Sequence, residues 1–218
     1  SQENELVHRL DASLGIHRGE EPQCGERILL NPGHWAYLRI SEGCNHRCAF
    51  CSIPAIRGRH VSVPLADLVA ETERLAARGV RELNVVAQDT TLWGIDLYGK
   101  PSLPLLLKSI AKVPGIRWVR LLYTHPAHIT DELARAFSES EVLVPYLDMP
   151  IQHINGVVLK RMNRIVGRAQ IEQIIHEFRT KIPHMVLRTT VIVGLPYETD
   201  RRFRDLLDFV EETKFDRL

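Results

Sequence analysis

WAYLRISEGCNHRCAFCSIP, residues 35–54, joins an apolar segment to a loop that carries three cysteines. Residues 35–41 are predicted to form a β-strand. Cys44, Cys48 and Cys51 follow it within eight positions. Ligands of α/β proteins bind at the carboxyl ends of parallel strands. The stretch therefore predicts a cysteine loop on the ligand-binding face of an α/β fold.

Length and composition favour one large domain in a reducing compartment. The chain has 218 residues, 44% hydrophobic residues and a formal net charge of +1 at pH 7. This length supports a sizeable core, and the balanced charge gives no overall signal for nucleic-acid binding. Three of the four cysteines are clustered, which favours a metal site over a disulfide framework. No signal peptide or membrane-spanning run is visible, so we expect a cytoplasmic protein with no membrane partner.

Strands and helices are predicted to alternate after the first strand. Residues 1–33 are predicted to be an interdomain linker with one short helix, and residues 34–218 the core domain. Predicted strands cover 35–41, 80–88, 116–124, 142–150 and 185–194, with a sixth starting at 215. Predicted helices cover 64–78 and 103–113, and others begin after Thr130, around Ile171 and at Thr199. This alternation implies a parallel sheet, either an open doubly wound sheet or a barrel.

Three cysteines fit more than one kind of metal site. A structural zinc site needs a fourth ligand, for which His46, His60 or Cys24 is available, whereas a catalytic zinc accepts three ligands and a water. Cys24 otherwise reads as a free thiol in the linker. A [4Fe–4S] cluster held by three thiolates leaves one iron open to a substrate. Phe50 lies beside Cys51, where its ring can cover a cluster or stack on adenine.

The spacing C-x₃-C-x-aromatic-C behind a first strand resembles the signature of the radical S-adenosylmethionine (SAM) superfamily. The resemblance implies an α/β fold that is a partial (β/α) TIM-like barrel. It also implies a [4Fe–4S] cluster on Cys44, Cys48 and Cys51, with SAM chelated by the open iron. In that family the reduced cluster passes one electron to the sulfonium, and a 5′-deoxyadenosyl radical then abstracts hydrogen.

Longer segments resemble the methylthiotransferases of that superfamily. SEGCNHRCAFCSIPAIRGRHVSVP (41–64) and IVGLPYET (192–199) are similar to their cysteine loop and their Gly-Pro turn. AQDTTLWGIDLYG (87–99), YLDMPIQHINGVVLKRMNR (146–164) and LRTTVIVG (187–194) resemble the RimO-type branch. That branch methylthiolates an aspartate of a small-subunit ribosomal protein (number twelve). The alternative is the branch that modifies a tRNA adenosine, and a distant alternative is a zinc-binding interaction module.

Several residues at the ends of predicted strands are candidate cofactor contacts, and each has a plainer interpretation. Gln88 and Asp89 are also typical of a turn. For His125, the plainer interpretation is a residue of the turn before Pro126 that has no role in binding. Gln152 and His153 are placed to touch ribose or a substrate carboxylate, and the plainer interpretation of His153 is a surface histidine. Arg188 is suited to binding a carboxylate of SAM or of an aspartyl substrate. Its plainer interpretation is a salt bridge on the side of the strand that faces a helix. The predicted cofactor contacts are Phe50, Gln88, Asp89, Gln152, Arg188, Thr190, Gly194 and Glu198.

The resemblance also sets expectations about missing parts and partners. Tyr197 stands where the family usually has Gly, and Val63 where it has a basic S-R-P segment. The family's N-terminal domain, with a second [4Fe–4S] cluster, and its C-terminal TRAM domain are not in this sequence, so we expect that cluster only in a longer protein. Expected partners are the ribosomal protein substrate and a flavodoxin- or ferredoxin-type electron donor. Basic residues at 57–60 and 160–168 suggest at most a weak RNA contact.

Overall fold

The computed structural model describes residue 29 and residues 32–218. The chain divides into two compact units, Ser1–Leu30 and Asn31–Leu218, and the second carries the described helices and strands. Cys24 and nearly all of the predicted linker at 1–33 lie outside the described residues.

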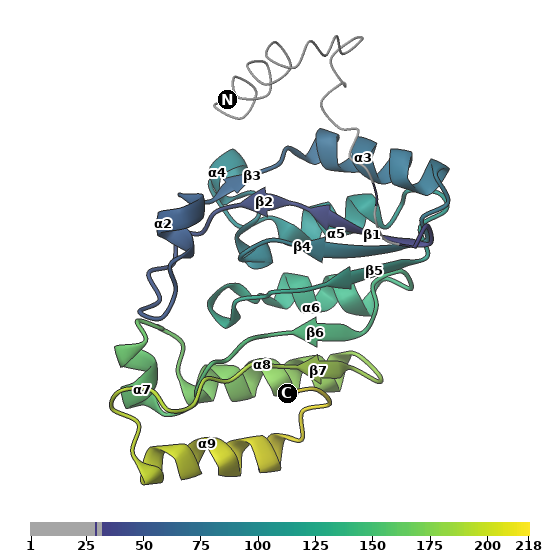
Figure 1. The fold of residues 1–218 in the computed structure, drawn as a ribbon. Helices are drawn as coiled ribbons and strands as arrows, with labels where there is room; N and C mark the ends of the chain where they lie inside the picture. Colours follow the sequence, from purple (N-terminus) through teal and green to yellow (C-terminus); the bar gives the residue numbers. More distant parts are fainter. Residues whose placement is uncertain (1–28, 30–31) are drawn as a thin grey trace. The chain divides into compact units, whose positions relative to one another are not determined.

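Apart from one short antiparallel pair, the strands of the second unit run parallel and follow one another in chain order (Figure 1). β1 (Trp35–Arg39) pairs with β4 (Glu82–Val86), and β4 pairs with β5 (Trp118–Leu121). A parallel bridge from Val119 to Leu143 leads towards β6 (Tyr146–Asp148), which pairs with β7 (Val186–Arg188). A further parallel bridge, from Arg188 to Arg217, begins the predicted sixth strand. The order does not reverse as it does in a doubly wound sheet, so the arc is a partial (β/α) barrel.

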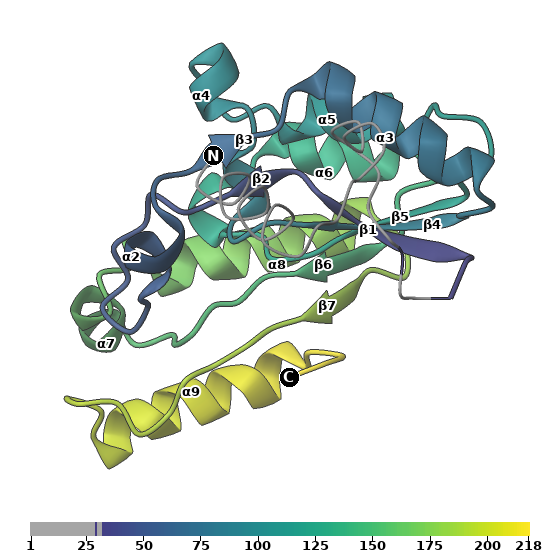
Figure 2. The ribbon, with the colours of Figure 1, turned by 45° about the horizontal axis from the view of Figure 1, so that its top comes forward.

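Helices cover one face of this arc. Figure 2 shows α3 (Leu65–Ala77), α5 (Leu103–Ile110), α6 (Asp131–Ser138) and α8 (Arg168–Lys181) on the same side of the strands. α9 (Asp200–Thr213) follows β7 at the end of the arc. The predicted helix starts at Thr130 and Thr199 are confirmed, because each side chain accepts a hydrogen bond from a backbone N–H of the first turn.

The core lies between the strands and these helices. Ala36 and Leu38 of β1 are fully buried, as are Leu83 and Val85 of β4. Successive side chains of a strand point to opposite faces, so this alternation directs one face of the sheet to the helices. The other face carries a mixture of aromatic and polar side chains, among them Tyr37, Asn84 and Trp118. None of the helices in the described part of the chain has the length and apolar character that a membrane span requires.

Observed strands are shorter than predicted at their carboxyl ends. The predicted strand 116–124 stops before Tyr123, whose φ is +57°, and the predicted strand 142–150 gives way to a loop in which Gln152 has φ +67°. Both values lie outside the β region. The structure also contains short elements that sequence periodicity did not predict. They are β2 (Ser41–Glu42), α2 (Ile53–Arg57), β3 (Val61–Ser62), η1 (Thr90–Leu92), α4 (Ile95–Tyr98), η2 (Pro126–His128) and α7 (Gly156–Arg161).

Candidate functional site

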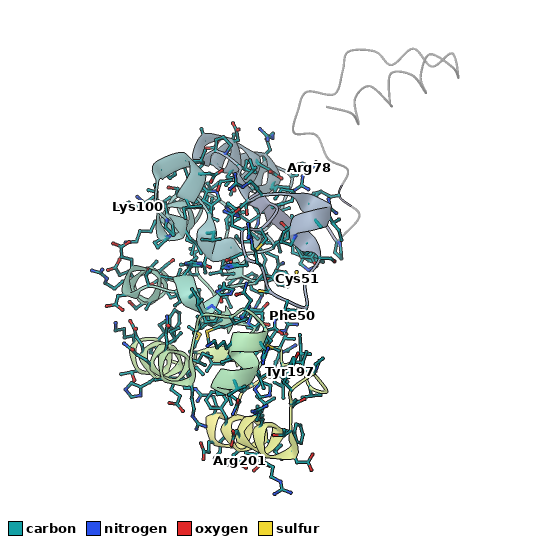
Figure 3. The ribbon with its side chains drawn as sticks, turned by 90° about the vertical axis from the view of Figure 1, so that its left-hand side faces the viewer. Phe50, Cys51, Arg78, Lys100, Tyr197 and Arg201 are labelled. Atoms are coloured by element: carbon teal, nitrogen blue, oxygen red, sulfur yellow. The ribbon has the colours of Figure 1, made fainter. Side chains whose placement is uncertain are left out.

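A cavity of about 300 Å³ opens at the carboxyl ends of the strands. Its walls come from the cysteine loop and from the segments that follow β4, β5, β6 and β7. Phe50 and Cys51 lie on the same side of the molecule as Tyr197 (Figure 3). The cavity is lined by Cys44, His46, Cys48, Phe50, Cys51, Gln88, Tyr123, Thr124, His125, Pro150, Gln152, Arg164 and Thr190.

The three cysteines form an electrostatically coupled set of free thiols. Cys44 and Cys48 are partly buried and Cys51 is exposed. Burial raises the pKa of the Cys44 thiol, and the negative charges of Asp89, Cys48 and Cys51 raise it further. A cation bound between these sulfurs removes that repulsion and favours the thiolate form that ligates metals. The donor set therefore fits a thiolate-bound metal centre.

The spacing of the sulfurs fits a cluster better than one zinc ion. In a tetrahedral site with Zn–S bonds of about 2.3 Å, the sulfurs lie about 3.8 Å apart. Of the residues that the structure describes, the three cysteines do not form a set whose ligand atoms all lie within 4.8 Å of one another. A cluster, whose thiolates bind separate metal atoms, accepts this wider spacing.

The histidines that the sequence offers as a fourth zinc ligand are bonded elsewhere. His46 Nε2 lies 2.7 Å from Asp89 Oδ2, and His60 Nε2 lies 3.1 Å from Ser62 Oγ. Burial lowers the pKa of the His60 ring, which is consistent with its place behind the loop. Neither ring is directed to the cysteines by these bonds.

One side of the cysteine loop depends on a close approach between backbone segments. β2 and β3 form a short antiparallel pair that brings the two ends of the loop together. Gly43 has φ +74°, and a Cβ atom there would collide with the carbonyl oxygen of Arg59. Beside it, Cys44 N donates to the carbonyl oxygen of Gly58 over 3.2 Å. Only glycine meets both requirements at position 43 without strain.

The other side of the loop is held by the segment that follows α7. Ala49 N donates to the carbonyl oxygen of Met162 over 3.0 Å, and Asn163 Nδ2 donates to that of Arg47 over 2.8 Å. Arg164 completes this contact by reaching Cys48 Sγ, with 3.9 Å between Nη1 and the sulfur. Residues more than a hundred positions away in the sequence therefore fix the shape of the cysteine loop.

A hydrogen-bonded stack of histidines lies beside the loop. The rings of His46 and His125 are stacked with 4.0 Å between their centroids and 13° between their planes, and His128 lies 5.3 Å from His46. Burial lowers the pKa of His125 to about 3, and the nearby cation of Arg164 contributes to this shift. Burial also lowers the pKa of His128. His125 and His128 are therefore neutral at pH 7.

Asp89 holds the His46 ring of this stack in place. Its carboxylate accepts hydrogen bonds from Thr91 N and Thr91 Oγ1 and pairs with His46. Burial alone raises the pKa of Asp89, but the hydrogen bonds from His46 and Thr91 outweigh it and the pKa is lowered. The ligand atoms of Asp89 and the three histidines lie within 4.8 Å of one another. The His46 and His125 rings are nearly parallel and do not direct their lone pairs at a common ion, so we interpret the stack as a support for His46.

Four predicted cofactor contacts line the cavity with the cysteines: Phe50, Gln88, Gln152 and Thr190. Gln152 Oε1 is buried and has no hydrogen-bond partner within the described part of the chain. A buried acceptor without a donor is costly, so this oxygen is suited to a donor group of a bound ligand. Gln88 is partly engaged, because its Nε2 donates to Glu42 Oε1 over 3.2 Å.

The other four predicted contacts lie outside the cavity lining. Asp89 is buried behind the wall under His46. Arg188 Nη1 lies 2.8 Å from both carboxylate oxygens of Asp148, so the chain supplies a carboxylate for this guanidinium. Gly194 donates its N–H to Glu198 Oε2. Glu198 Oε1 also lies 3.1 Å from Nε2 of the fully buried His153, which joins this turn to the loop after β6.

Tyr197 shows how the chain accommodates a departure from the family pattern. Its φ is +75°, a left-handed conformation that a glycine adopts without strain. The Arg161 guanidinium lies over the Tyr197 ring, 4.3 Å from its centroid. This contact is favourable because the ring face attracts a cation, and it offsets part of the strain.

Sequence reasoning did not predict several cavity residues. Tyr123 lies in a loop with no chemical signature. Pro150 and Arg164 lie in the segment 146–164 that resembles the RimO-type branch, but neither was predicted as a cavity residue. The segment Thr124-His125-Pro126 after the third predicted strand was the available signal for His125.

Comparisons with known proteins agree with this geometry. The family model described as "Radical SAM superfamily" matches residues 38–210. The chain is 48% identical over 193 residues to "Ribosomal protein uS12 methylthiotransferase RimO" of Thermoanaerobacter, with 88% of this chain and 44% of that protein covered. It is 43% identical over 220 residues to the protein of the same name of Alkaliphilus oremlandii, with 100% and 50% covered. The chain thus spans about half the length of the curated relatives it matches.

Solved structures share the fold at low sequence identity. The structure of the radical SAM methyltransferase TsrM from Kitasatospora setae matches with a TM-score of 0.66 and 19% identity, covering 83% of this chain and 33% of that one. Coproporphyrinogen III oxidase (HemN) from Escherichia coli matches with a TM-score of 0.60 and 18% identity, covering 84% and 42%. These matches confirm the fold.

Proposed function

Because this chain belongs to the radical SAM superfamily, whose cofactors are a [4Fe–4S] cluster and SAM, we propose that Cys44, Cys48 and Cys51 hold that cluster. Support comes from the three free sulfurs in one cavity and from the cation-favouring environment of Cys44. When bound, the reduced cluster supplies the electron that cleaves SAM into methionine and a 5′-deoxyadenosyl radical.

The remaining cavity residues are suited to holding and covering SAM. The unpartnered Oε1 of Gln152 accepts from an ammonium or hydroxyl group of the ligand. The Thr190 hydroxyl lies on the same wall and offers a second polar contact. Phe50 presents an apolar ring beside Cys51, where it keeps water away from the cluster and the bound nucleoside.

The complete protein, in this proposal, methylthiolates an aspartate of the small-subunit ribosomal protein uS12. The observation that carries this step is the 43–48% identity to several proteins that bear this name, over at least 88% of the chain. The three segments that resemble the RimO-type branch contribute Gln88, Gln152 and Thr190 to the cavity. The reaction at an unactivated C–H bond is consistent with the radical chemistry of the family.

The proposal extends to partners and location. Cys51 is exposed, which gives a flavodoxin- or ferredoxin-type donor access to the cluster. Contact with RNA is proposed to be weak, because the basic residues are partly neutralised within the chain. Arg168 pairs with Glu172 and Glu212, for example, and Arg57 with Glu42. A cytoplasmic location is proposed because thiols that bind such a cluster need a reducing compartment.

Anaerobic reconstitution with iron and sulfide tests the cluster assignment. We expect about four irons per chain, as one cube requires. Cys48→Ala is expected to lose the cluster and the reductive cleavage of SAM, because one iron loses its protein ligand. Cys24→Ala is the matched control and is expected to keep both. Stoichiometric zinc without iron, or SAM cleavage that survives Cys48→Ala, would rule out the assignment.

The substrate is tested in cells that lack the complete protein. Mass spectrometry of uS12 and of tRNA should show that the ribosomal protein loses its methylthio group while the tRNA keeps its own. The opposite pattern would assign the protein to the tRNA branch.

A further inference from the structure

We propose that Arg164 is a positioning residue for the cluster: its guanidinium orients Cys48 and makes the cluster easier to reduce. The inference rests on the proposed function, because it assumes that Cys48 is a cluster ligand. Arg188 is the only arginine among the predicted ligands and cofactor contacts. Arg164 therefore adds a second cation to the site.

Arg164 is a buried cation directed at a cluster ligand. Its relative exposure is 8%, and it lines the same cavity as the cysteines. Nη1 lies 3.9 Å from Cys48 Sγ, and Nη2 donates to the carbonyl oxygen of Pro150 over 2.6 Å. One planar guanidinium therefore connects the cysteine loop to the loop that follows β6.

The charge of Arg164 is not neutralised by an acidic side chain of the described residues. Every other strongly buried ionised group of the site has a partner, such as His46 for Asp89 and Arg188 for Asp148. For Arg164, no ion pair with Asp or Glu occurs at N···O distances up to 4.0 Å among residues 32–218. A buried cation without a counter-charge is unfavourable. The thiolates of the cysteine loop are the negative groups that complete this pairing.

The backbone holds Arg164 in place independently of its side chain. Arg164 follows Asn163, whose φ of +56° reverses the chain after α7. Asn163 Nδ2 donates to the carbonyl oxygen of Arg47, and Met162 accepts from Ala49 N. The guanidinium is therefore presented to Cys48 by a segment that is already fixed to the cysteine loop.

This position has an electrostatic consequence. Reduction adds one negative charge to the cluster and its thiolates, and a neighbouring cation stabilises the reduced state more than the oxidised state. Hydrogen bonds to cluster sulfurs and nearby charge are recognised determinants of cluster potential. Loss of the Arg164 charge is therefore expected to lower the potential.

The test is a redox titration of the reconstituted 218-residue chain without SAM, followed by electron paramagnetic resonance of the reduced cluster. Omitting SAM keeps any contact between Arg164 and that ligand out of the measurement. For Arg164→Gln, we expect the ratio of reduced to oxidised cluster at fixed electrode potential to fall about tenfold, a shift of about 59 mV for a one-electron couple. Arg164→Lys keeps the charge and is expected to stay within about threefold of the wild type.

Arg161→Gln is the matched control, because Arg161 is a cation of the same segment that lies over the Tyr197 ring. It should leave the ratio unchanged. An unchanged ratio in Arg164→Gln, or an equal fall in Arg161→Gln, would overturn the proposal.

Loss of iron from a variant is also decisive. If Arg164→Gln loses its cluster, Arg164→Lys decides between a charge effect and a purely structural role. Lysine lacks the planar fork that reaches Pro150 and Cys48 together, so a structural role predicts that both variants lose iron, which would contradict the proposal. A lysine variant with full iron and a near-wild-type ratio would support it. A wild-type chain without a four-iron cluster would instead reject the proposed function itself.

Discussion

Arg188 and Asp148 form an ion pair in which one partner is fully buried. Asp148 is shielded from solvent, whereas the Arg188 side chain retains 38% of its exposure. Tyr123 N also donates to Asp148 Oδ2 over 3.3 Å, so this carboxylate links β6, β7 and the loop after β5. The Asp148 charge raises the pKa of Arg188 and keeps the guanidinium protonated. Two roles therefore compete for Arg188: the structural ion pair with Asp148 and the predicted contact with SAM.

A substitution separates these roles. Arg188→Gln is expected to lower the free energy of unfolding by roughly 1–3 kcal/mol, because it leaves a buried carboxylate without its charged partner. The double variant Asp148→Asn with Arg188→Gln should recover part of this loss. Urea denaturation measures both effects, and SAM affinity is measured in parallel. Weaker SAM binding without a loss of stability would show that Arg188 serves the cofactor instead.

The cysteine loop is the element in which local backbone geometry matters most. Gly43 and Gly58 have φ values of +74° and +75°, and Gly58 has ψ −160°, so a side chain at either position is strained in a conformation that favours glycine. They differ in space, because a Cβ at Gly43 would collide with the carbonyl of Arg59 while one at Gly58 meets no atom within 4 Å. The pair therefore separates conformational strain from steric collision.

Gly58→Ala is expected to cost about 1–3 kcal/mol of stability, the strain of a side chain in a backbone region that only glycine adopts readily. Gly43→Ala adds an overpacking penalty of about 1–3 kcal/mol and displaces Cys44, so it should also lower the iron content. Thermal unfolding and iron analysis of both variants provide the comparison. Equal iron contents would show that the loop tolerates movement at Gly43.

Sequence periodicity predicts long helices better than short ones. Helices such as α3 and α8 span 13 and 14 residues, which is long enough for an apolar period to be recognised. α4 and α7 span 4 and 6 residues and show no such period. These short elements carry or brace the site, so its surroundings were missed while its cysteines were found.

The cysteines were predictable because all three lie in one short, continuous segment of the sequence. The stack of His46, His125 and Asp89 was not, because its members come from three separate loops and meet only in the folded chain. The same holds for Arg164, which lies 116 positions from Cys48 in the sequence. Arg188 and Asp148 illustrate a further limit, since position on a strand does not reveal which carboxylate pairs with the guanidinium.

For the whole molecule, buried histidines predict acid sensitivity. The pKa of His125 is about 3 in the folded chain and 6.5 in its ordinary state, so the unfolded chain binds the proton first as the pH falls. His125 therefore has no effect above pH 6.5, and the folded state loses up to about 1.4 kcal/mol per pH unit as the pH falls from 6.5 towards 3. Burial of His60 and His128 acts in the same direction. Asp89, whose pKa is lowered, stabilises the fold above pH 3.8 and loses this effect as the pH falls through its folded pKa.

The predicted consequence is a shallower pH dependence in His125→Asn. Between pH 6.5 and 4, its free energy of unfolding should fall less steeply than that of the wild type, while His176→Asn on the exposed face of α8 should follow the wild type. Urea denaturation at several pH values gives these slopes. Equal slopes for the His125→Asn variant and the wild type would show that His125 is not buried in its neutral form.

The agreement between strand order and chain order bears on how the molecule is assembled during translation. From β4 onwards, each strand lies next to a strand that precedes it in the sequence. A nascent chain that emerges at about 5–20 residues per second can therefore add each new strand to an existing edge. Parallel pairing is slow because long crossovers must close first. Growth from one end limits the time during which any hydrophobic edge stays open to aggregation.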